Sequence, residues 1–221
     1  NFSKFLKTKY STFVNSGSSA NLLIAQTLLE GNYLKNKVVV LPAVSWSTTV
    51  SPFLQLGFKV ILCDCDKNNL GLSIQHLQKI CKIYKPGLVG VVNVLGHSNN
   101  FNEIFKLKKK YNFKLIEDNC ESMGSQTYKK NLGTFGLASS HSFYYGHHIS
   151  TIEGGMVSTN DKKFYNISLA IRRACVSLKV RKTEGLISFK TGNTFLRMLL
   201  RTYLLLKLDA SSRQEIRCSW A

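Results

Sequence analysis

Two adjacent histidines, His147 and His148, stand between an aromatic run and a Glu-Gly-Gly turn in SFYYGHHISTIEGG, residues 142–155. Histidine has an ordinary pKa near neutrality, so it can take up and release a proton under cellular conditions. Neighbouring side chains on an extended chain point to opposite faces. We therefore expect the two imidazoles to face different ways, with one of them available for proton transfer.

A second stretch has the features of an anion site. In NSGSSANLLIAQTLL, residues 15–29, small residues lead directly into an apolar helical pattern. The free backbone N–H groups and the dipole of a helix N-terminus attract anions, and Gly17, Ser18 and Ser19 leave room for a phosphate. Taken alone, the stretch fits a plain serine cap in a tight turn better.

A third stretch places carboxylates at the end of an apolar strand. FKLIEDNCES, residues 113–122, runs into Glu117 and Asp118. Such carboxylates are usually solvated or cap the next helix, but one placed below a pyridine ring would keep the ring nitrogen protonated by charge pairing. Pyridoxal-phosphate enzymes need that role, and the Ser142 hydroxyl could add a hydrogen bond to the phosphate.

The elements around these residues alternate between short β-branched runs and longer helical patterns. This alternation predicts an α/β fold of βαβ units, with a mostly parallel sheet flanked by helices. Asp64, Asn93 and Asp118 then lie at or just beyond the carboxyl ends of strands, where open α/β sheets bind ligands. We expect strands near 37–41, 59–63, 88–93, 113–117, 139–144 and 155–159, and helices near 18–30, 48–56, 73–84, 101–111 and 161–173.

The composition is that of a globular chain. Of 221 residues, 44% are hydrophobic, and no apolar run approaches the roughly 20 residues of a membrane-spanning helix. Lys and Arg outnumber Asp and Glu by 30 to 12, for a net charge of +18. Such a charge suits nucleic acid or a small phosphorylated ligand. Because the lysines are scattered and no aromatic side chains are interleaved with them, we expect no nucleic-acid partner.

The cysteines predict neither a metal site nor disulfides. There are 6, and none forms a CxxC pair. Cys63 and Cys65 share one face of a strand, but no second pair completes a set of metal ligands. We expect no metal, no signal peptide and a reduced cytoplasmic protein.

The pattern changes near residue 174. We expect 1–174 to form one domain, incomplete at its amino terminus because the chain opens on Asn1. We expect 175–221 to be an unmatched basic tail, truncated or read in another frame. Its segment FLRMLLRTYLLLKL, 195–208, fits an amphipathic helix on a membrane or partner, or a helix that packs on a core.

Taken together, in this order and at these spacings, the three stretches resemble the DegT/DnrJ/EryC1/StrS sugar aminotransferase family, a branch of the fold type I pyridoxal-phosphate enzymes. The resemblance covers roughly residues 2–173 and implies the large domain of that fold, with the small carboxyl-terminal domain missing, in a homodimer. In the family an aromatic side chain at the place of Trp46 stacks on the cofactor ring. The cofactor-binding residues that the resemblance implies are Gly17, Ser18, Trp46, Asp118, Glu121 and Ser142.

One position departs from the aminotransferase pattern. Family aminotransferases carry a lysine five residues after the phosphate-binding serine, and here that place is His147. An imidazole cannot bond covalently to pyridoxal phosphate, so the cofactor would be held non-covalently and work in its pyridoxamine phosphate form. Histidine at this place marks the family's sugar 3-dehydratases.

The resemblance therefore implies a dehydratase of deoxysugar biosynthesis of the O-antigen type. It would remove the C3 hydroxyl of a nucleotide-linked 4-keto-6-deoxyhexose, with His147 as acid and base and glutamate as amino donor. His148 is assigned to structure or to the subunit contact.

Other interpretations stay open. A nucleotide-sugar aminotransferase would require lysine at position 147. A CDP-hexose dehydrase needs an iron–sulfur cluster held by several cysteines, whereas most cysteines here fall in strand and helix patterns. An inactive fragment of the family and a basic binding module are the remaining alternatives.

Overall fold

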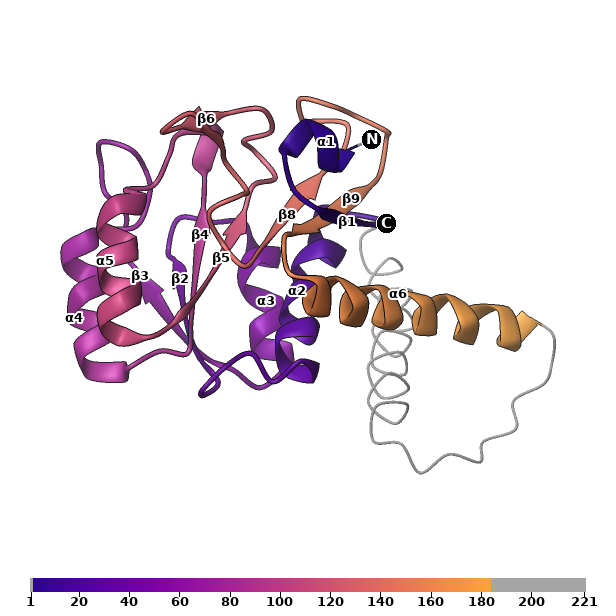
Figure 1. Ribbon diagram of the computed structural model, residues 1–221, viewed down its shortest axis with the longest axis horizontal. Coiled ribbons are helices and arrows are strands. Elements are labelled where there is room, and N and C mark those ends of the chain that lie inside the picture. Colours follow the sequence, from indigo (N-terminus) through magenta and orange to yellow (C-terminus); the bar gives the residue numbers. More distant parts are fainter. Residues whose placement is uncertain (1, 184–221) are drawn as a thin grey trace, which may run out of the picture. The chain divides into compact units, whose positions relative to one another are not determined.

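The computed structural model describes residues 2–183 and contains a seven-stranded sheet in the order β1-β9-β8-β5-β4-β2-β3 (Figure 1). Residues 1–172 form one compact unit. The strands are β1 (Tyr10–Val14), β2 (Val38–Pro42), β3 (Lys59–Cys63), β4 (Leu88–Val92), β5 (Lys114–Asp118), β8 (Ala138–Ser142) and β9 (Gly155–Thr159), with a separate hairpin of β6 (Gln126–Thr127) and β7 (Lys130–Asn131). The helices are α1 (Phe2–Leu6), α2 (Gly17–Glu30), α3 (Ser47–Gln55), α4 (Ile74–Tyr84), the 3-10 turn η1 (Val94–Gly96), α5 (Phe101–Tyr111) and α6 (Lys162–Thr183).

The sheet is mostly parallel, as the alternation of patterns predicted. The pairs β3–β2, β2–β4, β4–β5 and β5–β8 are parallel, whereas β9 is antiparallel to both β8 and β1. The predicted strands and helices are all present, and only α6 differs clearly in length, since it continues to Thr183. β1 and the hairpin of β6 and β7 were not predicted. The boundary at 174 stays a prediction, and the predicted helix at 195–208 lies outside the described residues.

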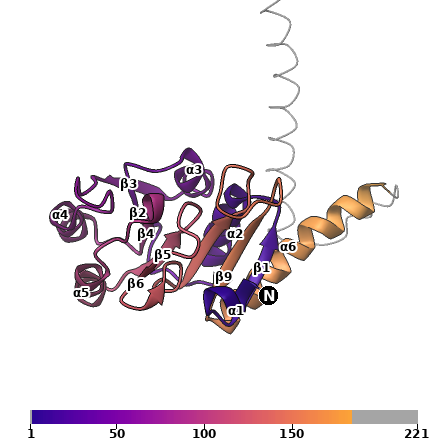
Figure 2. The ribbon, with the colours of Figure 1, turned by 90° about the horizontal axis from the view of Figure 1, so that it is seen from above.

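Helices cover both faces of the sheet (Figure 2). α2 and α3 pack on one face, and α4 and α5 pack on the other. Because side chains alternate along a strand, Val89, Val91 and Leu115 all point toward α4 and α5, where they join a core with Leu77 and Ile104. The same alternation decides which residues of β5 can reach α2.

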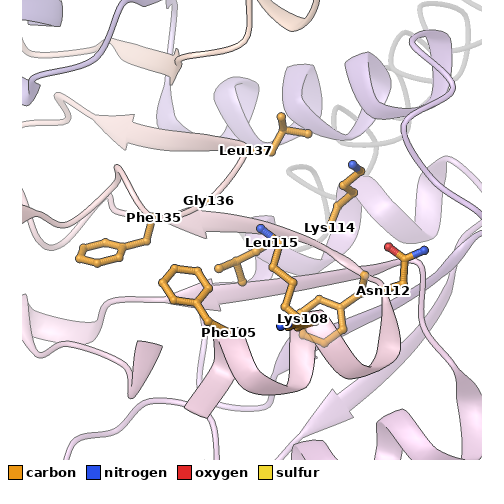
Figure 3. Close-up of a pocket in the computed structure, with 10 residues that line it drawn as sticks. Phe105, Lys108, Asn112, Lys114, Leu115, Phe135, Gly136 and Leu137 are labelled. Carbon is orange, nitrogen blue, oxygen red and sulfur yellow. The ribbon is translucent and has the colours of Figure 1, made fainter. Parts of the chain in front are cut away.

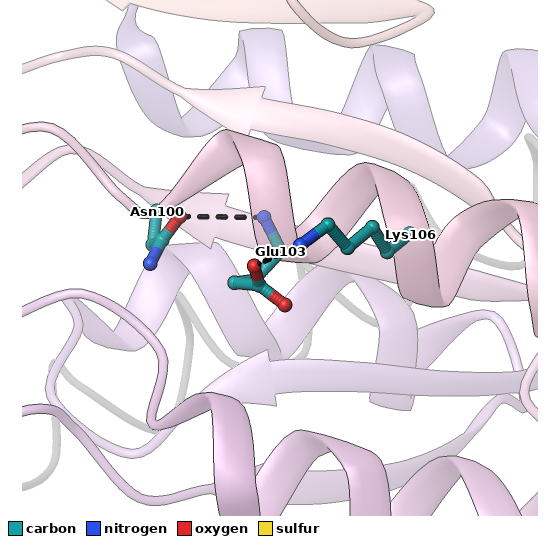
Figure 4. Close-up of polar contacts among 3 residues, drawn as sticks. All are labelled: Asn100, Glu103 and Lys106. Carbon is teal, nitrogen blue, oxygen red and sulfur yellow. Dashed lines mark hydrogen bonds and ion pairs between the residues drawn. The ribbon is translucent and has the colours of Figure 1, made fainter.

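α5 shows how local sequence sets the helix ends. Asn100 caps its start by accepting the N–H of Glu103 at 3.3 Å, and Lys106 forms an ion pair with Glu103 at 2.6 Å (Figure 4). Its last turn carries three lysines, which complement the negative end of the helix dipole. Asn112 ends the helix in the left-handed conformation, with φ of 52°.

Glu117 and Asp118 are adjacent on β5 and therefore face opposite sides of the sheet. Glu117 is buried, and its carboxylate accepts the N–H groups of Gly133, Phe135 and Gly136 at 2.6–2.7 Å. Burial raises the pKa of Glu117, and the hydrogen bonds that it accepts oppose the rise. The side chain thus anchors the loop at 133–136 to the sheet.

His141 lies on the opposite side of β8 from Ser142 and is fully buried. The Ser139 hydroxyl donates to the Gly133 carbonyl at 2.7 Å, so the hydrogen bond of 3.0 Å between Ser139 and His141 uses an Nε2–H of the imidazole. Nδ1 then has no partner among the described residues. Burial lowers the pKa of His141 from 6.5 to about 3, partly offset by the charge of Asp118.

We expect His141 to make the fold sensitive to acid. The unfolded chain protonates this imidazole near its ordinary pKa of 6.5, whereas the folded chain does so only near 3. The free energy of unfolding therefore falls as the pH drops through this window, by at most about 1.4 kcal/mol per pH unit from this group. Urea unfolding followed by circular dichroism should show a shallower pH dependence in His141→Phe.

The exposed His148 supplies the matched control, because its removal takes away an imidazole with little burial. His148→Phe should keep the pH dependence of the native chain. Equal slopes for the native chain and His141→Phe would contradict the assignment of a neutral, buried imidazole.

Candidate active site

The turn before α2 meets the end of β8. The Ser16 hydroxyl caps the helix by accepting the N–H of Ser19 at 3.1 Å. A Cβ added to Gly17 would lie 2.7 Å from the Cβ of Ser142 and 2.9 Å from the Sγ of Cys120. Only glycine lets the helix begin this close to the strand, and the first-turn N–H groups have no partner further back along the helix.

The first turns of α2 and α3 are joined beside this point. The Ser18 hydroxyl donates to the Thr48 hydroxyl at 3.0 Å. Trp46 stands just before α3, and 72% of its side chain is exposed. A large aromatic ring therefore stands open to solvent next to the predicted phosphate turn.

Asp118 ends β5 on the face that α2 and α3 cover. Its Oδ2 accepts a hydrogen bond of 2.7 Å from the Thr49 hydroxyl and one of 2.9 Å from the Asn21 amide, while its Oδ1 accepts the N–H of Cys120 at 3.2 Å. The side chain is only 8% exposed. Oδ2 is thus held by two side chains from two helices, and Oδ1 has a single backbone donor.

Glu121 supports the neighbouring loop. Its carboxylate accepts the N–H of Leu95 at 3.2 Å, in a turn where Leu95 has a φ of 49°. Nearby, the buried Asn93 links the loops after β4 and β5 through hydrogen bonds to Glu117 and Asn119, each 3.2 Å. The carboxyl ends of β4 and β5 are therefore tied together as one edge.

The loop that carries the two histidines spans residues 143–154. Its base is closed by the N–H of Phe143, which donates to the Gly154 carbonyl at 2.9 Å. Gly154 forms a bridge with Ser16, and a Cβ on Gly155 would lie 2.1 Å from the Ser16 carbonyl oxygen. The loop thus starts and ends against the turn that precedes α2.

The expectation of an extended backbone at the two histidines was wrong. β8 ends at Ser142, two residues before the predicted strand end at 144, and both histidines lie in a bend. His147 is half-buried, its N–H donates to the Tyr144 carbonyl at 3.0 Å, and its ring lies 6.3 Å from that of Tyr144. His148 is exposed. The two side chains do differ in exposure, but turn geometry rather than strand alternation is the reason.

The structure brings some of the predicted residues together and shows others that were missed. Gly17 contacts Ser142, and Asp118 is bound to both helices that begin at this edge. Asn21 and Thr49 were not predicted as partners of Asp118. The signal for Asn21 was present, because it is a buried amide inside an otherwise apolar helical run.

The arrangement fits a phosphate next to a protonated ring nitrogen. A glycine turn, the N–H groups of a first helical turn and the Ser142 hydroxyl lie together, which is the set of groups that a phosphate site requires. Asp118 supplies an oriented carboxylate a short distance away on the same face. Within residues 2–183 no group of three His, Cys, Asp or Glu side chains is arranged to hold a metal ion.

A cavity of about 480 Å³ opens elsewhere (Figure 3). It is lined by residues at the end of α5 and the start of β5, including Lys114. The cavity therefore lies at the amino-terminal end of β5, whereas Asp118 lies at its carboxyl end. None of the predicted site residues lines it.

None of the helices in residues 2–183 has the length and apolar character needed to cross a membrane.

Thr49 should stabilise the site through its hydroxyl. Thr49→Val keeps the shape of the side chain but removes one of the two side-chain donors to Asp118 Oδ2. Loss of a buried hydrogen bond to a charged group should lower the free energy of unfolding by about 1–3 kcal/mol in chemical denaturation.

Thr49→Ser is the matched control, since it keeps the hydroxyl and loses only a methyl group, for which about 0.8 kcal/mol is expected. If the valine and serine variants lost the same stability, packing rather than the hydrogen bond would account for the effect.

Comparison with known proteins was consistent with this geometry. A model of the DegT/DnrJ/EryC1/StrS aminotransferase family matches residues 1–195. The chain is 39% identical over 197 residues to GDP-4-keto-6-deoxy-D-mannose 3-dehydratase of Escherichia coli O55:H7. The aligned region covers 88% of this chain and 50% of that protein.

Two solved structures extend the likeness to three dimensions. The E. coli GDP-4-keto-6-deoxy-D-mannose 3-dehydratase with bound hydrated pyridoxal phosphate matches with a TM-score of 0.70 and 41% identity, over 77% of this chain and 44% of that one. A structure of the same kind of enzyme with a trapped geminal diamine of pyridoxal phosphate and glutamate gives a TM-score of 0.68 and 38% identity, over 77% and 45%. The fold type I class predicted from the sequence is confirmed, and the chain spans about half the length of these relatives.

Proposed function

The chain belongs to the DegT/DnrJ/EryC1/StrS aminotransferase family, and from this we propose that it is the cofactor-binding part of a nucleotide-sugar 3-dehydratase. The reaction would remove the C3 hydroxyl of a GDP-linked 4-keto-6-deoxyhexose, the substrate class for which its relatives are named. One observation carries the proposal. A histidine, not a lysine, stands five residues after Ser142, in a loop whose base closes on the phosphate turn.

Pyridoxal phosphate, cycling with pyridoxamine phosphate, supplies the electron sink for this chemistry when it is bound. Gly17 and Ser18 would hold its phosphate through the N-terminus of α2, together with the Ser142 hydroxyl. Asp118 would pair with the ring nitrogen, and the exposed Trp46 would stack on the ring. Glu121 stands at the same edge, bound to the loop after β4.

His147 would move the protons. An imidazole cannot form the covalent link to the cofactor that a lysine forms at this position, so His147 is free to act as a base. It would accept a proton from the C4′ carbon of the bound pyridoxamine phosphate, and the imidazolium that results would donate this proton to the C3 hydroxyl, which leaves as water. Its backbone is held in the bend by the Tyr144 carbonyl, and the residue is only partly buried.

His147→Lys tests this assignment through covalent chemistry. The native chain should bind pyridoxal phosphate with a visible absorption band that glutamate shifts to the pyridoxamine form, and borohydride should trap no adduct. The lysine variant should give an adduct that borohydride fixes and mass spectrometry places on residue 147. His148→Lys, at the exposed neighbour, should trap none.

Two results would contradict the proposal. Absence of pyridoxal-phosphate binding by the native chain would favour an inactive relative of the family. The second is binding of the cofactor by His147→Lys without an adduct, or an adduct in His148→Lys instead. Either outcome would show that residue 147 does not lie next to the cofactor.

Asp118→Asn tests the ring-nitrogen partner. The amide cannot supply the negative charge, so we expect cofactor affinity to fall about tenfold or more in an absorbance titration. The half-buried Asp66 lies in the loop after β3, away from Asp118 in the chain, and Asp66→Asn should leave the affinity unchanged. Equal affinity of Asp118→Asn and the native chain would remove Asp118 from the cofactor site.

Partners follow from the same premise. Glutamate is proposed as amino donor, in line with the glutamate adduct named for a relative. A homodimer is supported by large side chains left open around the site: Trp46 is 72% exposed, Tyr145 70% and Ile152 78%. A cytoplasmic location is proposed from the cysteines, since Cys63, Cys65, Cys81 and Cys120 are free thiols.

A further inference from the structure

The cavity at the amino-terminal edge of β5 is separate from the candidate active site. Lys114 opens β5 and Asp118 ends it, so along the strand the two lie about 13 Å apart. The cavity has about 480 Å³, within the range of roughly 300–1,000 Å³ that small-molecule sites occupy. No part of the proposed dehydratase chemistry uses it.

The walls combine apolar surface with positive charge. Phe105 and Phe135 give flat apolar surface, and every charged residue in the lining is a lysine. The Lys108 ammonium lies 5.7 Å from the centre of the Phe105 ring. The one ion pair found among residues 2–183 joins other side chains, so the lysines of the cavity have no carboxylate partner there.

Lys108 carries an electrostatic cost in this position. Burial lowers its pKa, and the neighbouring charge of Lys114 lowers it further. A ligand with two negative charges would relieve the repulsion between these ammonium groups and take the place of the missing carboxylates. Figure 3 shows the side chains of both lysines beside Leu115, with Phe135 across the cavity.

The wall formed by Phe135 and Gly136 is held in place by contacts within the protein. Glu117 accepts the N–H groups of Phe135 and Gly136 at 2.6 and 2.7 Å from the core side, and the Phe135 ring stacks on Phe101 with centroids 4.1 Å apart. A Cβ on Gly136 would lie 2.9 Å from the Leu115 carbonyl oxygen, so the wall is packed directly onto β5. A preformed wall reduces the entropy that binding must overcome.

We propose that this cavity binds a small organic phosphate. Its planar ring rests on the phenylalanine side chains, and its dianionic phosphate pairs with Lys108 and Lys114. The site is independent of pyridoxal-phosphate binding, so either proposal can fail without the other.

Phenyl phosphate is the probe, titrated into the full chain and followed by amide NMR and calorimetry. Saturable shifts are expected at Phe135 and Gly136. Inorganic phosphate lacks the ring and benzyl alcohol lacks the charge, so each should bind at least about tenfold more weakly. Lys108→Gln and Lys114→Gln should each weaken phenyl phosphate by about tenfold.

Lys110→Gln is the matched control. It lies on the same helix and changes the net charge equally, but its ammonium lies over Tyr111 and it does not line the cavity. Its affinity should equal that of the native chain. Equal weakening by Lys110→Gln and Lys108→Gln would show general attraction to a basic chain and overturn the proposal. So would shifts confined to Gly17 and Ser18, or no saturation at millimolar probe.

Discussion

The Asp118 carboxylate is the point on which the candidate site depends. It receives hydrogen bonds from Asn21 on α2, from Thr49 on α3 and from the backbone of Cys120. A carboxylate that is only 8% exposed must have such donors, because burial without them is costly. The same bonds join β5 to the starts of both helices that bear on the site. Structural support and orientation of the predicted ring-nitrogen partner therefore come from one set of contacts.

The second constraint is close approach of backbones around Ser16. Gly17 allows α2 to begin against Ser142, and Gly155 lets β9 pass the Ser16 carbonyl. A side chain on either glycine would push the phosphate turn and the histidine loop apart. Two glycines thus bring into contact segments that are more than a hundred residues apart in the chain. The loop that carries His147 starts and ends at this contact.

β5 also separates two environments along its length. Its carboxyl end carries Asp118 and faces the region that fits the proposed cofactor. Its amino end borders the lysine-lined cavity, whose wall is fastened by the neighbouring carboxylate, Glu117. Because adjacent residues point to opposite faces, Glu117 and Asp118 serve different layers of the sheet. Positive charge at one end and an oriented carboxylate at the other thus share one short strand.

The sequence by itself determined the parallel α/β order, most element bounds and the identity of the motif residues, because hydrophobic periodicity and glycine turns are local signals. Asp118 at a strand end and His147 five residues after Ser142 could be read directly from it. Only the tertiary structure decided which partners surround them. Asn21 and Thr49 meet Asp118 across 97 and 69 residues, and the loop that carries His147 closes on Ser16 through Gly154. Such contacts arise from packing between distant segments, which no local pattern encodes.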